Sequence, residues 1–543
     1  MLKSNSSELN VLPVFGLLAL MNHAYFHRFE PKSAGGPIFF LTVQPLLPFL
    51  AFGEPLSFYR VCFAYLSFFF ALSSSIILYR ISPWHPLAHI PGPMVNKVTM
   101  LWSVFLAAGG KQYRVNKMLH DKHGPFVRTG PNEVSIVHVD AVKTVLATSG
   151  FQKGQYYEPR TDPSLGVRSL LSLRGDAHAN RRRIWNRGMS MESLNGYETI
   201  LVKRITQLVA RLEGLAGPMP VDMSKWLGYF TFDVMGDMAF GGGFEMVRDG
   251  RDKEGAWTLI EQGAKNISVM SQIPWIVPTL QKIPILTRGI RKLRKFGAAC
   301  AANRIKSGSQ VKDLWYHLTD EAGQEKVKPA YKEVVADGVL SVIAGSDTTS
   351  TALSCLVCLL LSNPEAYRRV QAEIDYVYPD GESSLDALKH SELQFLTACL
   401  NETLRLHPPV PTNGPRQSPR GGKLVAGRFI PEGTQIYIPH YSLHRRAEHF
   451  SWPEKFDPDR WLRAQQPGEV FNQAAFIPFS AGAANCVGMR LAWREMLMVT
   501  STLLRNFNLR FADGFQPNEW LDELQDVFVT SIGGPLQVVI SPR

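Results

Sequence analysis

The first ninety residues carry long apolar runs with few charges. Residues 61–78 form an uncharged run that is just long enough to cross the hydrocarbon core of a bilayer as a helix. Two shorter apolar stretches, residues 11–26 and 38–52, precede it, the first interrupted by polar residues and the second by prolines. Each of them could span the bilayer or lie in its interface. The pattern therefore predicts a membrane anchor over residues 1–90, with one to three membrane-spanning helices.

The charges that flank these runs indicate how the anchor is oriented. Arg28 and Lys32 lie between the first two runs, and Arg80 follows the third. Three spans would place both basic groups on the cytosolic side, in agreement with the positive-inside tendency, and a single span would also leave the rest of the chain in the cytosol. A proline-rich hinge at residues 83–93 stiffens the joint to the following domain. We expect an endoplasmic reticulum membrane protein whose larger part faces the cytosol.

A second long apolar segment lies in the middle of the chain. From about residue 334 to residue 361 the sequence is rich in valine, leucine and isoleucine, which predicts a largely buried helix. Asp347, Thr348 and Thr349 interrupt this segment, although these residue types favour caps and turns over helix interiors. Such an interruption often marks a kink or bulge at a functional site. A kink without any chemistry is the alternative.

The remaining periodicity is mostly helical. Two short runs, residues 126–128 and 134–137, read as strands, so we expect a mainly α-helical fold with small β-sheets. The six cysteines among 543 residues show no paired spacing, which argues against a disulfide framework or a zinc site and favours a reducing compartment. The net charge is +11, but without a polybasic tail or interleaved aromatic residues the chain is a poor candidate for binding nucleic acid.

Near the C-terminus, one cysteine stands in a loop that points to metal chemistry. Residues 479–488 read Phe-Ser-Ala-Gly-Ala-Ala-Asn-Cys-Val-Gly and precede a helix-like run, so the sulfur of Cys486 is expected at a helix N-terminus, where a thiolate is favoured. A thiolate in such a loop suits an axial ligand of haem iron. Gly482 would let the backbone turn close under the porphyrin, and Phe479 would pack beside the sulfur. A buried structural cysteine is the alternative.

This loop resembles the haem-binding loop of the cytochrome P450 family, whose pattern is Phe-x-x-Gly-x-Arg-x-Cys-x-Gly. The matching residues are Phe479, Gly482, Cys486 and Gly488. Ala484 stands where the family has an arginine that pairs with a haem propionate. The resemblance implies the cytochrome P450 fold in one catalytic domain over residues 91–543, with haem b as cofactor and Cys486 as the axial thiolate ligand of its iron.

An acid and a base three residues apart, Glu402 and Arg405, lie on one face of a predicted helix that ends at His407 before two prolines. By itself this pair could be an ordinary exposed ion pair. It resembles the family's Glu-x-x-Arg motif, and residues 456–461 resemble the Pro-x-Arg segment. The resemblance implies that Arg460 closes a triad with Glu402 and Arg405 beneath the haem, and that the triad is structural rather than catalytic.

The polar interruption of the central helix resembles the oxygen-activating turn of the same family. The resemblance implies that Thr348 hydrogen-bonds dioxygen or a water above the iron. It also implies that Asp347 relays protons inward and that Gly345 leaves room for the oxygen.

Basic residues elsewhere resemble the family's propionate-binding groups. His178 and Arg182 are four residues apart on a predicted helix that ends near Met189, so both can face one ligand. Arg416 resembles another propionate-binding arginine. Together these residues could compensate for Ala484. A basic helix face that is simply solvated is the alternative.

These motifs predict a haem-thiolate monooxygenase that inserts one atom of dioxygen into a lipophilic organic substrate, in secondary metabolism or detoxification. Two alternatives stay open. One is a haem-thiolate isomerase or dehydratase that does not activate oxygen, and the other is a non-catalytic haem-binding membrane protein. The presence of both Asp347 and Thr348 favours the monooxygenase.

The resemblance also implies the partners. An NADPH-dependent flavin reductase would dock on the thiolate side of the haem, where Arg490 and Arg494 suit an acidic partner, and cytochrome b5 is a further candidate. Membrane lipid would surround the anchor. An apolar pocket under a lid fits a lipophilic substrate. The segments that correspond to the family's pocket walls are residues 156–171, 267–286, 339–348, 409–414 and 528–533.

Overall fold

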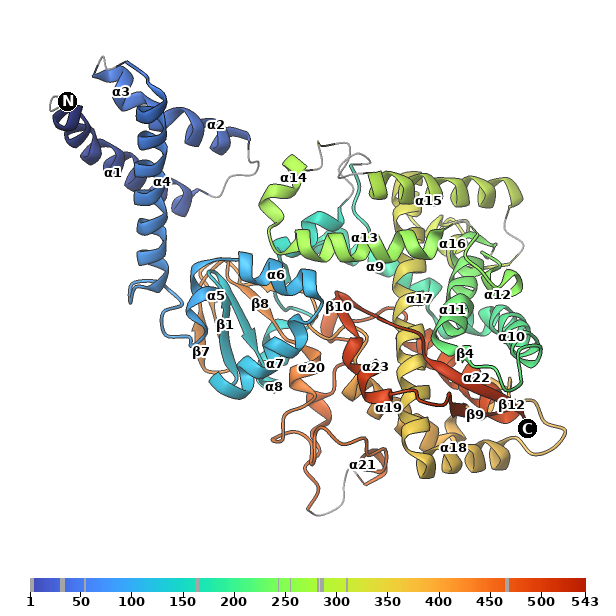
Figure 1. Ribbon diagram of the computed structural model, residues 1–543. Coiled ribbons are helices and arrows are strands. Elements are labelled where there is room, and N and C mark those ends of the chain that lie inside the picture. The colour runs from blue at the N-terminus through green and yellow to red at the C-terminus, as the bar shows by residue number, and fades with distance from the viewer. Residues whose placement is uncertain are drawn as a thin grey trace.

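The computed structural model of the chain (Figure 1) has a slender N-terminal part and a large, mostly helical body. It describes residues 4–29, 35–52, 55–161, 166–242, 244–253, 255–280, 283, 288–308, 311–463 and 468–543.

The N-terminal part consists of helices that project from one side of the body (Figure 1). They are α1 (Ser4–Arg28), α2 (Gly35–Val43), η1 (Gln44–Leu46), α3 (Leu47–Ala51) and α4 (Phe58–Ile81). Phe15, Phe49 and Phe68 belong to a small core between α1, α3 and α4, while Leu66 and Phe70 of α4 are 73% and 76% exposed. Among the described helices, α4 and α17 (Tyr331–Ser362) are long and apolar enough to cross a membrane, and α17 is mostly buried in the protein.

The body contains most of the helices. The α-helices other than α17 are α5 (Met94–Val98), α6 (Leu101–Gly109), α7 (Gln112–His123), α8 (Val139–Val145), α9 (Gly175–Gly188), α10 (Met191–Glu213), α11 (Met223–Phe240), α12 (Met246–Asp249), α13 (Ala256–Ser271), α14 (Val277–Leu280), α15 (Arg288–Ser307), α16 (Leu314–Leu318), α18 (Pro364–Val377), α19 (Gln394–Leu406), α20 (His440–Leu443), α21 (Asp459–Leu462), α22 (Met489–Asn506) and α23 (Pro517–Glu523). The short 3-10 turns are η2 (Gln155–Arg160), η3 (Pro274–Ile276), η4 (Ala387–Glu392), η5 (Gln473–Ala475) and η6 (Gly482–Ala484).

The long helix α17 passes through the middle of the body (Figure 1) and packs against α11, α19 and α22. Its second half is apolar and buried, as the sequence predicted. The bulge expected at residues 347–349 is not present, because α17 is α-helical at every residue, and the expected kink stays a prediction. The Thr348 hydroxyl donates to the Ala344 carbonyl at 2.7 Å, which lets this polar side chain bond within its own helix.

The sheets are small, as predicted. The strands are β1 (Phe126–Gly130), β2 (Glu133–Ile136), β3 (Gln152–Lys153), β4 (Val221–Asp222), β5 (Arg416–Gln417), β6 (Lys423–Val425), β7 (Arg428–Ile430), β8 (Gln435–Tyr437), β9 (Phe507–Phe511), β10 (Gln525–Val527), β11 (Val529–Ser531) and β12 (Gln537–Pro542). One sheet has the order β1-β2-β8-β5-β3 and another β4-β12-β9, with β6–β7 and β10–β11 as separate hairpins. Within the first sheet, β3 places Lys153 directly opposite Arg416 of β5.

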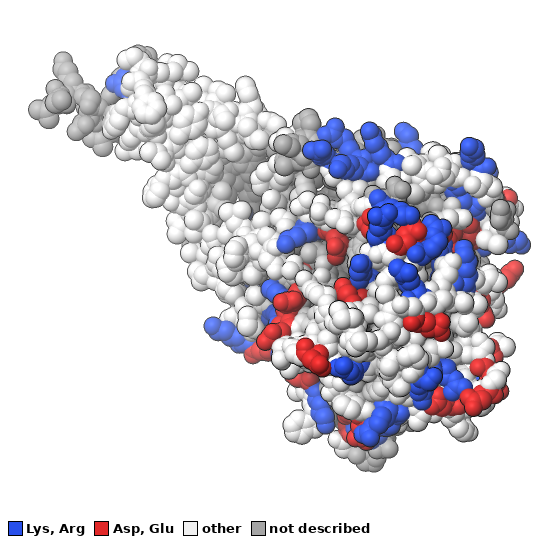
Figure 2. Space-filling view, turned by 45° about the vertical axis from the view of Figure 1, so that its right-hand side comes forward, with Lys and Arg blue, Asp and Glu red and all other residues white. Residues whose placement is uncertain are grey.

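Charge is distributed unevenly over the surface. Figure 2 shows an N-terminal part that is almost free of charged residues and basic side chains that gather on the upper face of the body. Helix α15 contributes Arg288, Arg291, Lys292 and Lys295, which are exposed, to this surface. The apolar N-terminal surface is the kind that a lipid environment covers.

Candidate functional site

The loop that carries Cys486 connects η6 to the start of α22. The Cys486 N–H donates to the Phe479 carbonyl at 2.8 Å, and the Asn485 N–H donates to the Gly482 carbonyl at 3.1 Å. Backbone hydrogen bonds within the loop therefore fix its path, and the Cys486 side chain is exposed to a cavity.

The cavity-facing sulfur is nevertheless surrounded by protein. Burial raises the pKa of the Cys486 thiol, while a hydrogen bond from the Gly488 backbone and the charge of Arg182 lower it, and burial prevails. The expectation that the helix N-terminus favours a thiolate here is therefore wrong for the protein alone. A coordinated metal cation deprotonates such a thiol.

Gly482 is required by a close approach between two loops. Its φ is +71°, and a Cβ there would lie 1.7 Å from the Leu146 carbonyl oxygen and 2.5 Å from the Ala147 carbonyl carbon. The loop after α8 is thus a neighbour that excludes a side chain at Gly482. Phe479 lines the cavity beside Cys486, and its ring centroid lies 6.4 Å from that of Trp493 in α22.

One cavity of about 800 Å³ brings most of the sequence-predicted residues together. Cys486 and Phe479 lie in its wall, and α17 contributes Gly345, Asp347 and Thr348. The segments expected to form the substrate pocket also contribute to the wall, among them Tyr157, Ile267, Val339, Val410 and Phe528. Residues 281–282 and 284–286 of the expected lid, and residues 162–165 of the expected wall segment 156–171, lie outside the described residues.

The carboxyl of Asp347 is perturbed by its surroundings. Burial raises its pKa to about 7, and the carboxylate of Glu261 in α13 adds to the increase. Glu261 lies in the wall of the same cavity and accepts a hydrogen bond from the Ser531 hydroxyl at 3.4 Å. A carboxyl whose pKa lies near neutrality can both release and accept protons under ordinary conditions. The sequence reading missed Glu261, because nothing local marks a single acid on an amphipathic helix.

A group of basic residues occupies another part of the cavity wall. His178, Arg182 and Arg416 were expected there, and Lys153 joins them. Burial and the charges of Arg416, Arg182 and Arg174 lower the pKa of Lys153 to about 7. Burial and the charges of Lys153, Arg182 and Arg416 lower the pKa of His178 to about 4.

Two of these residues, Arg416 and Lys153, have few hydrogen-bond partners in the part of the chain that the structure describes. Arg416 is only 6% exposed, and its Nε has no hydrogen-bond partner among the described residues. Lys153 donates from Nζ to the Leu170 carbonyl at 2.9 Å. Like charges directly opposite each other on paired strands repel, so this wall would be stabilised by an anionic ligand.

Arg182 reaches the cysteine loop itself. Its Nη1 donates to the Asn485 carbonyl oxygen at 2.6 Å and its Nη2 to Asn485 Oδ1 at 2.7 Å. From the sequence we expected Arg182 to bind a propionate, but its contact with Asn485 was not predicted. The two residues are 303 positions apart in the chain.

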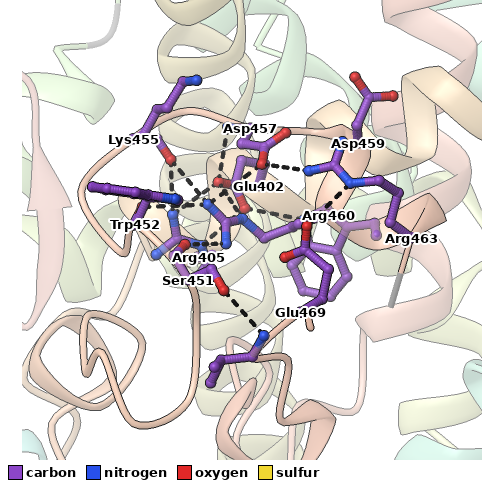
Figure 3. A network of polar contacts seen from close by, with 12 residues as sticks. Glu402, Arg405, Ser451, Trp452, Lys455, Asp457, Asp459, Arg460, Arg463 and Glu469 are labelled. Carbon is purple, nitrogen blue, oxygen red and sulfur yellow. Dashed lines mark hydrogen bonds and ion pairs between the residues drawn. The ribbon is translucent and has the colours of Figure 1, made fainter. Parts of the chain in front are cut away.

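The predicted triad is assembled away from the cavity, in the network drawn in Figure 3. Glu402 accepts from Arg405 Nε and Nη2, both at 2.8 Å, and from Arg460 Nε at 3.0 Å. Arg405 and Arg460 also donate to backbone carbonyls of residues 444–455. The network therefore ties α19 to the long segment that leads toward the cysteine loop.

The basic residues of α22 differ in their availability. Arg494 donates from Nη1 to the Leu194 carbonyl at 2.9 Å and from Nη2 to Asn195 Oδ1 at 2.9 Å, so it is engaged with α10. Arg490 is exposed and stays available to a partner.

The residues around the cavity fit a haem. A thiol open to the cavity can ligate iron, and apolar walls suit the macrocycle. The basic residues suit the haem carboxylates, since they include a buried guanidinium nitrogen with no hydrogen-bond partner among the described residues. Asp347 and Thr348 lie in the wall of the same cavity.

A sequence model described as Cytochrome P450 matches residues 91–534. Cytochrome P450 67 of Uromyces fabae is 32% identical over 542 residues, which cover 97% of this chain and 98% of that protein. Tryprostatin B 6-hydroxylase of Aspergillus fumigatus is 31% identical and covers 87% of this chain and 83% of its own length. Cytochrome P450 monooxygenase FCK2 of Fusarium pseudograminearum is 31% identical, with coverages of 89% and 86%. This agreement along nearly the whole chain, added to a cavity that suits a haem, means that the chain belongs to the cytochrome P450 family and is a haem-thiolate monooxygenase.

Proposed function

We propose that this enzyme hydroxylates a lipophilic secondary metabolite, with Cys486 as the axial ligand of the haem iron and with Asp347 and Thr348 as the pair that delivers protons. The observation that carries this proposal is the cavity itself, whose wall contains Cys486 from one element and the acid and alcohol of α17 from another. That two similar proteins are named a hydroxylase and a monooxygenase supports the reaction class.

The residues around the haem divide into a ligand, a shield and an anion-binding group. Haem, when bound, supplies the oxidising chemistry, and the protein positions and tunes it. Cys486 binds the iron, and Phe479 limits the access of water to the sulfur. Lys153, Arg182 and Arg416 would bind the propionates, since their mutual repulsion is relieved by two carboxylates. His178, with a pKa of about 4, would donate a hydrogen bond to a propionate as a neutral imidazole.

Proton delivery rests on the carboxyl of Asp347. With a pKa of about 7, Asp347 is partly protonated at neutral pH, so it can give up a proton from its carboxyl oxygen and recover one from solvent. The Thr348 hydroxyl donates its one proton to the Ala344 carbonyl, so toward the cavity its oxygen accepts a hydrogen bond. This pair argues against an isomerase or dehydratase, which needs no such proton supply.

The pocket walls favour an apolar substrate. Val339, Leu340 and Ile343 of α17 face the cavity, as do Val529 and Ile532 of the C-terminal hairpin region. Burying apolar surface against them contributes about 25 cal/mol for each Å² removed from water, so lipophilic molecules should bind best.

We further propose that residues 1–90 anchor the enzyme in the endoplasmic reticulum membrane and that residues 91–543 form a catalytic domain facing the cytosol. Support comes from α4, a helix of 24 residues that is uncharged from residue 61 to residue 78 and turns large side chains outward. An NADPH-dependent flavin reductase, or cytochrome b5, would dock on the thiolate side near Arg490. Alkaline extraction and protease accessibility of full-length protein in microsomes test this topology, and release of the intact chain by carbonate would contradict it.

The reaction is tested with full-length enzyme, a flavin reductase, NADPH and heavy-isotope dioxygen, across a panel of lipophilic substrates. The expected product carries one labelled oxygen atom. Thr348→Ala should continue to consume NADPH while the product yield falls about 10²-fold or more. Turnover that needs neither NADPH nor reductase, and that leaves the product unlabelled, would instead establish an isomerase or dehydratase.

A further inference from the structure

The cysteine loop lacks the positive charge that the family places in it. Residues 479–488 contain no lysine or arginine, and Ala484 occupies the arginine position with a methyl group. Ala484 lies in the cavity wall, so this position faces the site without contributing a charge. A cation that holds the loop in place has to come from another element.

Arg182 of α9 is in a position to do this. Its two Nη atoms donate hydrogen bonds to the carbonyl oxygen and the Oδ1 of Asn485, at 2.6 and 2.7 Å. The fork therefore fixes both the backbone and the side chain of the residue that directly precedes Cys486. Its Nε donates to Asn186 Oδ1 at 2.9 Å, one turn further along α9, which orients the guanidinium plane.

Arg182 retains capacity for a ligand after making these bonds. A guanidinium has five N–H donors, and the three contacts to Asn186 and Asn485 use three of them. Arg182 lines the cavity together with Lys153, His178 and Arg416, so its remaining donors belong to the cationic part of the wall.

We propose that Arg182 and Asn485 together replace the missing loop arginine: Asn485 draws the Arg182 guanidinium onto the cysteine loop, and this clamp holds Cys486 in register with the haem. The inference rests on the proposed role of Cys486 as the iron ligand. Asn485 is a positioning residue, because it acts through Arg182 and through the peptide that carries Cys486. A lysine could not replace Arg182, since a single ammonium cannot span both acceptors in one plane.

The clamp is tested by the rate at which haem leaves the full-length protein for excess apomyoglobin. Asn485→Ala should accelerate haem loss about 10-fold, within the range seen when a residue that supports a metal ligand is removed. Arg182→Lys keeps the charge and should have a similar effect. The double variant should be little worse than either single one, because both remove the same contact.

Two further variants make the test specific. Ala484→Arg, introduced into the Asn485→Ala protein, should restore slow haem loss by returning a cation to the loop. Asn195→Ala is the matched control, because it removes a similar contact, from Arg494 Nη2 to Asn195 Oδ1 at 2.9 Å, at a place away from the cysteine loop. Its haem-loss rate should be that of the wild type.

The outcomes separate the clamp from the iron ligand. Wild-type haem retention in Asn485→Ala, additive effects in the double variant, or no rescue by Ala484→Arg would each refute the clamp. All of these variants retain Cys486. Haem that stays bound to them should therefore give the same absorption as the wild type in its reduced, carbon monoxide-bound form. A wild-type protein without a thiolate spectrum would refute the ligand assignment instead. If Asn485→Ala does not fold, the haem-loss rates of Arg182→Lys with and without Ala484→Arg provide the same test.

Discussion

Glu402 offers the sharpest test of how the fold supports the cysteine loop. Its carboxylate is 0% exposed and accepts five hydrogen bonds. Besides the bonds from Arg405 and Arg460, it receives one from the Asp457 N–H at 3.0 Å and one from Trp461 Nε1 at 3.1 Å. The two arginines are themselves 0% and 1% exposed, so this carboxylate is the counter-charge that both share.

Glu402→Gln keeps the size of the side chain and removes its charge. Breaking a buried pair in this way leaves a cation uncompensated, which costs about 3–5 kcal/mol. The amide NH₂ of the glutamine would also face N–H groups whose hydrogen bonds the carboxylate accepts. For a chain of this length, the average entropy of unfolding converts such a loss into a decrease in Tm of about 3–4 °C.

The assay is thermal unfolding of the full-length protein at one fixed scan rate, followed by tryptophan fluorescence and by haem absorbance. Asp513→Asn serves as the control, because its pair with Arg510 is 96% and 58% exposed and should contribute at most about 1 kcal/mol. If Glu402→Gln unfolds within 1 °C of the control, the triad does not stabilise the fold, and the reasoning from burial fails.

Three further predictions concern the cavity and its loop. Because the pKa of Asp347 is about 7, its protonated fraction and the product yield per NADPH should fall as pH rises through neutrality. Glu261→Gln removes a neighbouring negative charge, so this decline should move to lower pH. An unchanged pH profile in Glu261→Gln would contradict the electrostatic coupling between Glu261 and Asp347. Gly482→Ala should abolish haem binding, measured by absorbance, because Gly482 has a φ of +71° and a Cβ there would collide with Leu146. The control Gly427→Ala, at φ +79° with open space around it, should lower the free energy of unfolding by only about 1–2 kcal/mol. Lys153→Met should leave the haem-free protein as stable as the wild type or more so, since it removes one of two opposed cations. In the apomyoglobin assay it should weaken haem retention about 10-fold. Slower haem loss than in the wild type would refute a role of Lys153 in anion binding.

Local sequence patterns were sufficient for the elements whose signals are local. The buried face of α17 follows from apolar periodicity, and the end of α19 at Leu406 follows from the prolines after His407. The cysteine loop and the Glu-x-x-Arg helix are short motifs, so the residues they contain could be named before their neighbours in space were known.

The contacts that depend on the tertiary fold could not be predicted in this way. Lys153 is a single lysine in a short strand, and it becomes part of the site only because β3 pairs with β5 and sets it opposite Arg416. Asn485 meets Arg182 across 303 positions. The reason for Gly482 is equally remote, since the atom that excludes a side chain belongs to Leu146. The expected low pKa of Cys486 failed because burial outweighs the helix terminus and Arg182.

The central claim is that Cys486 holds the haem iron as a thiolate. The most direct test is the absorption difference spectrum of the reduced, carbon monoxide-bound full-length protein, compared with that of Cys486→Ser. We predict a strongly red-shifted Soret band in the wild type that is absent from Cys486→Ser. A band at the position typical of histidine-ligated haem in the wild type, or a red-shifted band that survives in Cys486→Ser, would contradict the account.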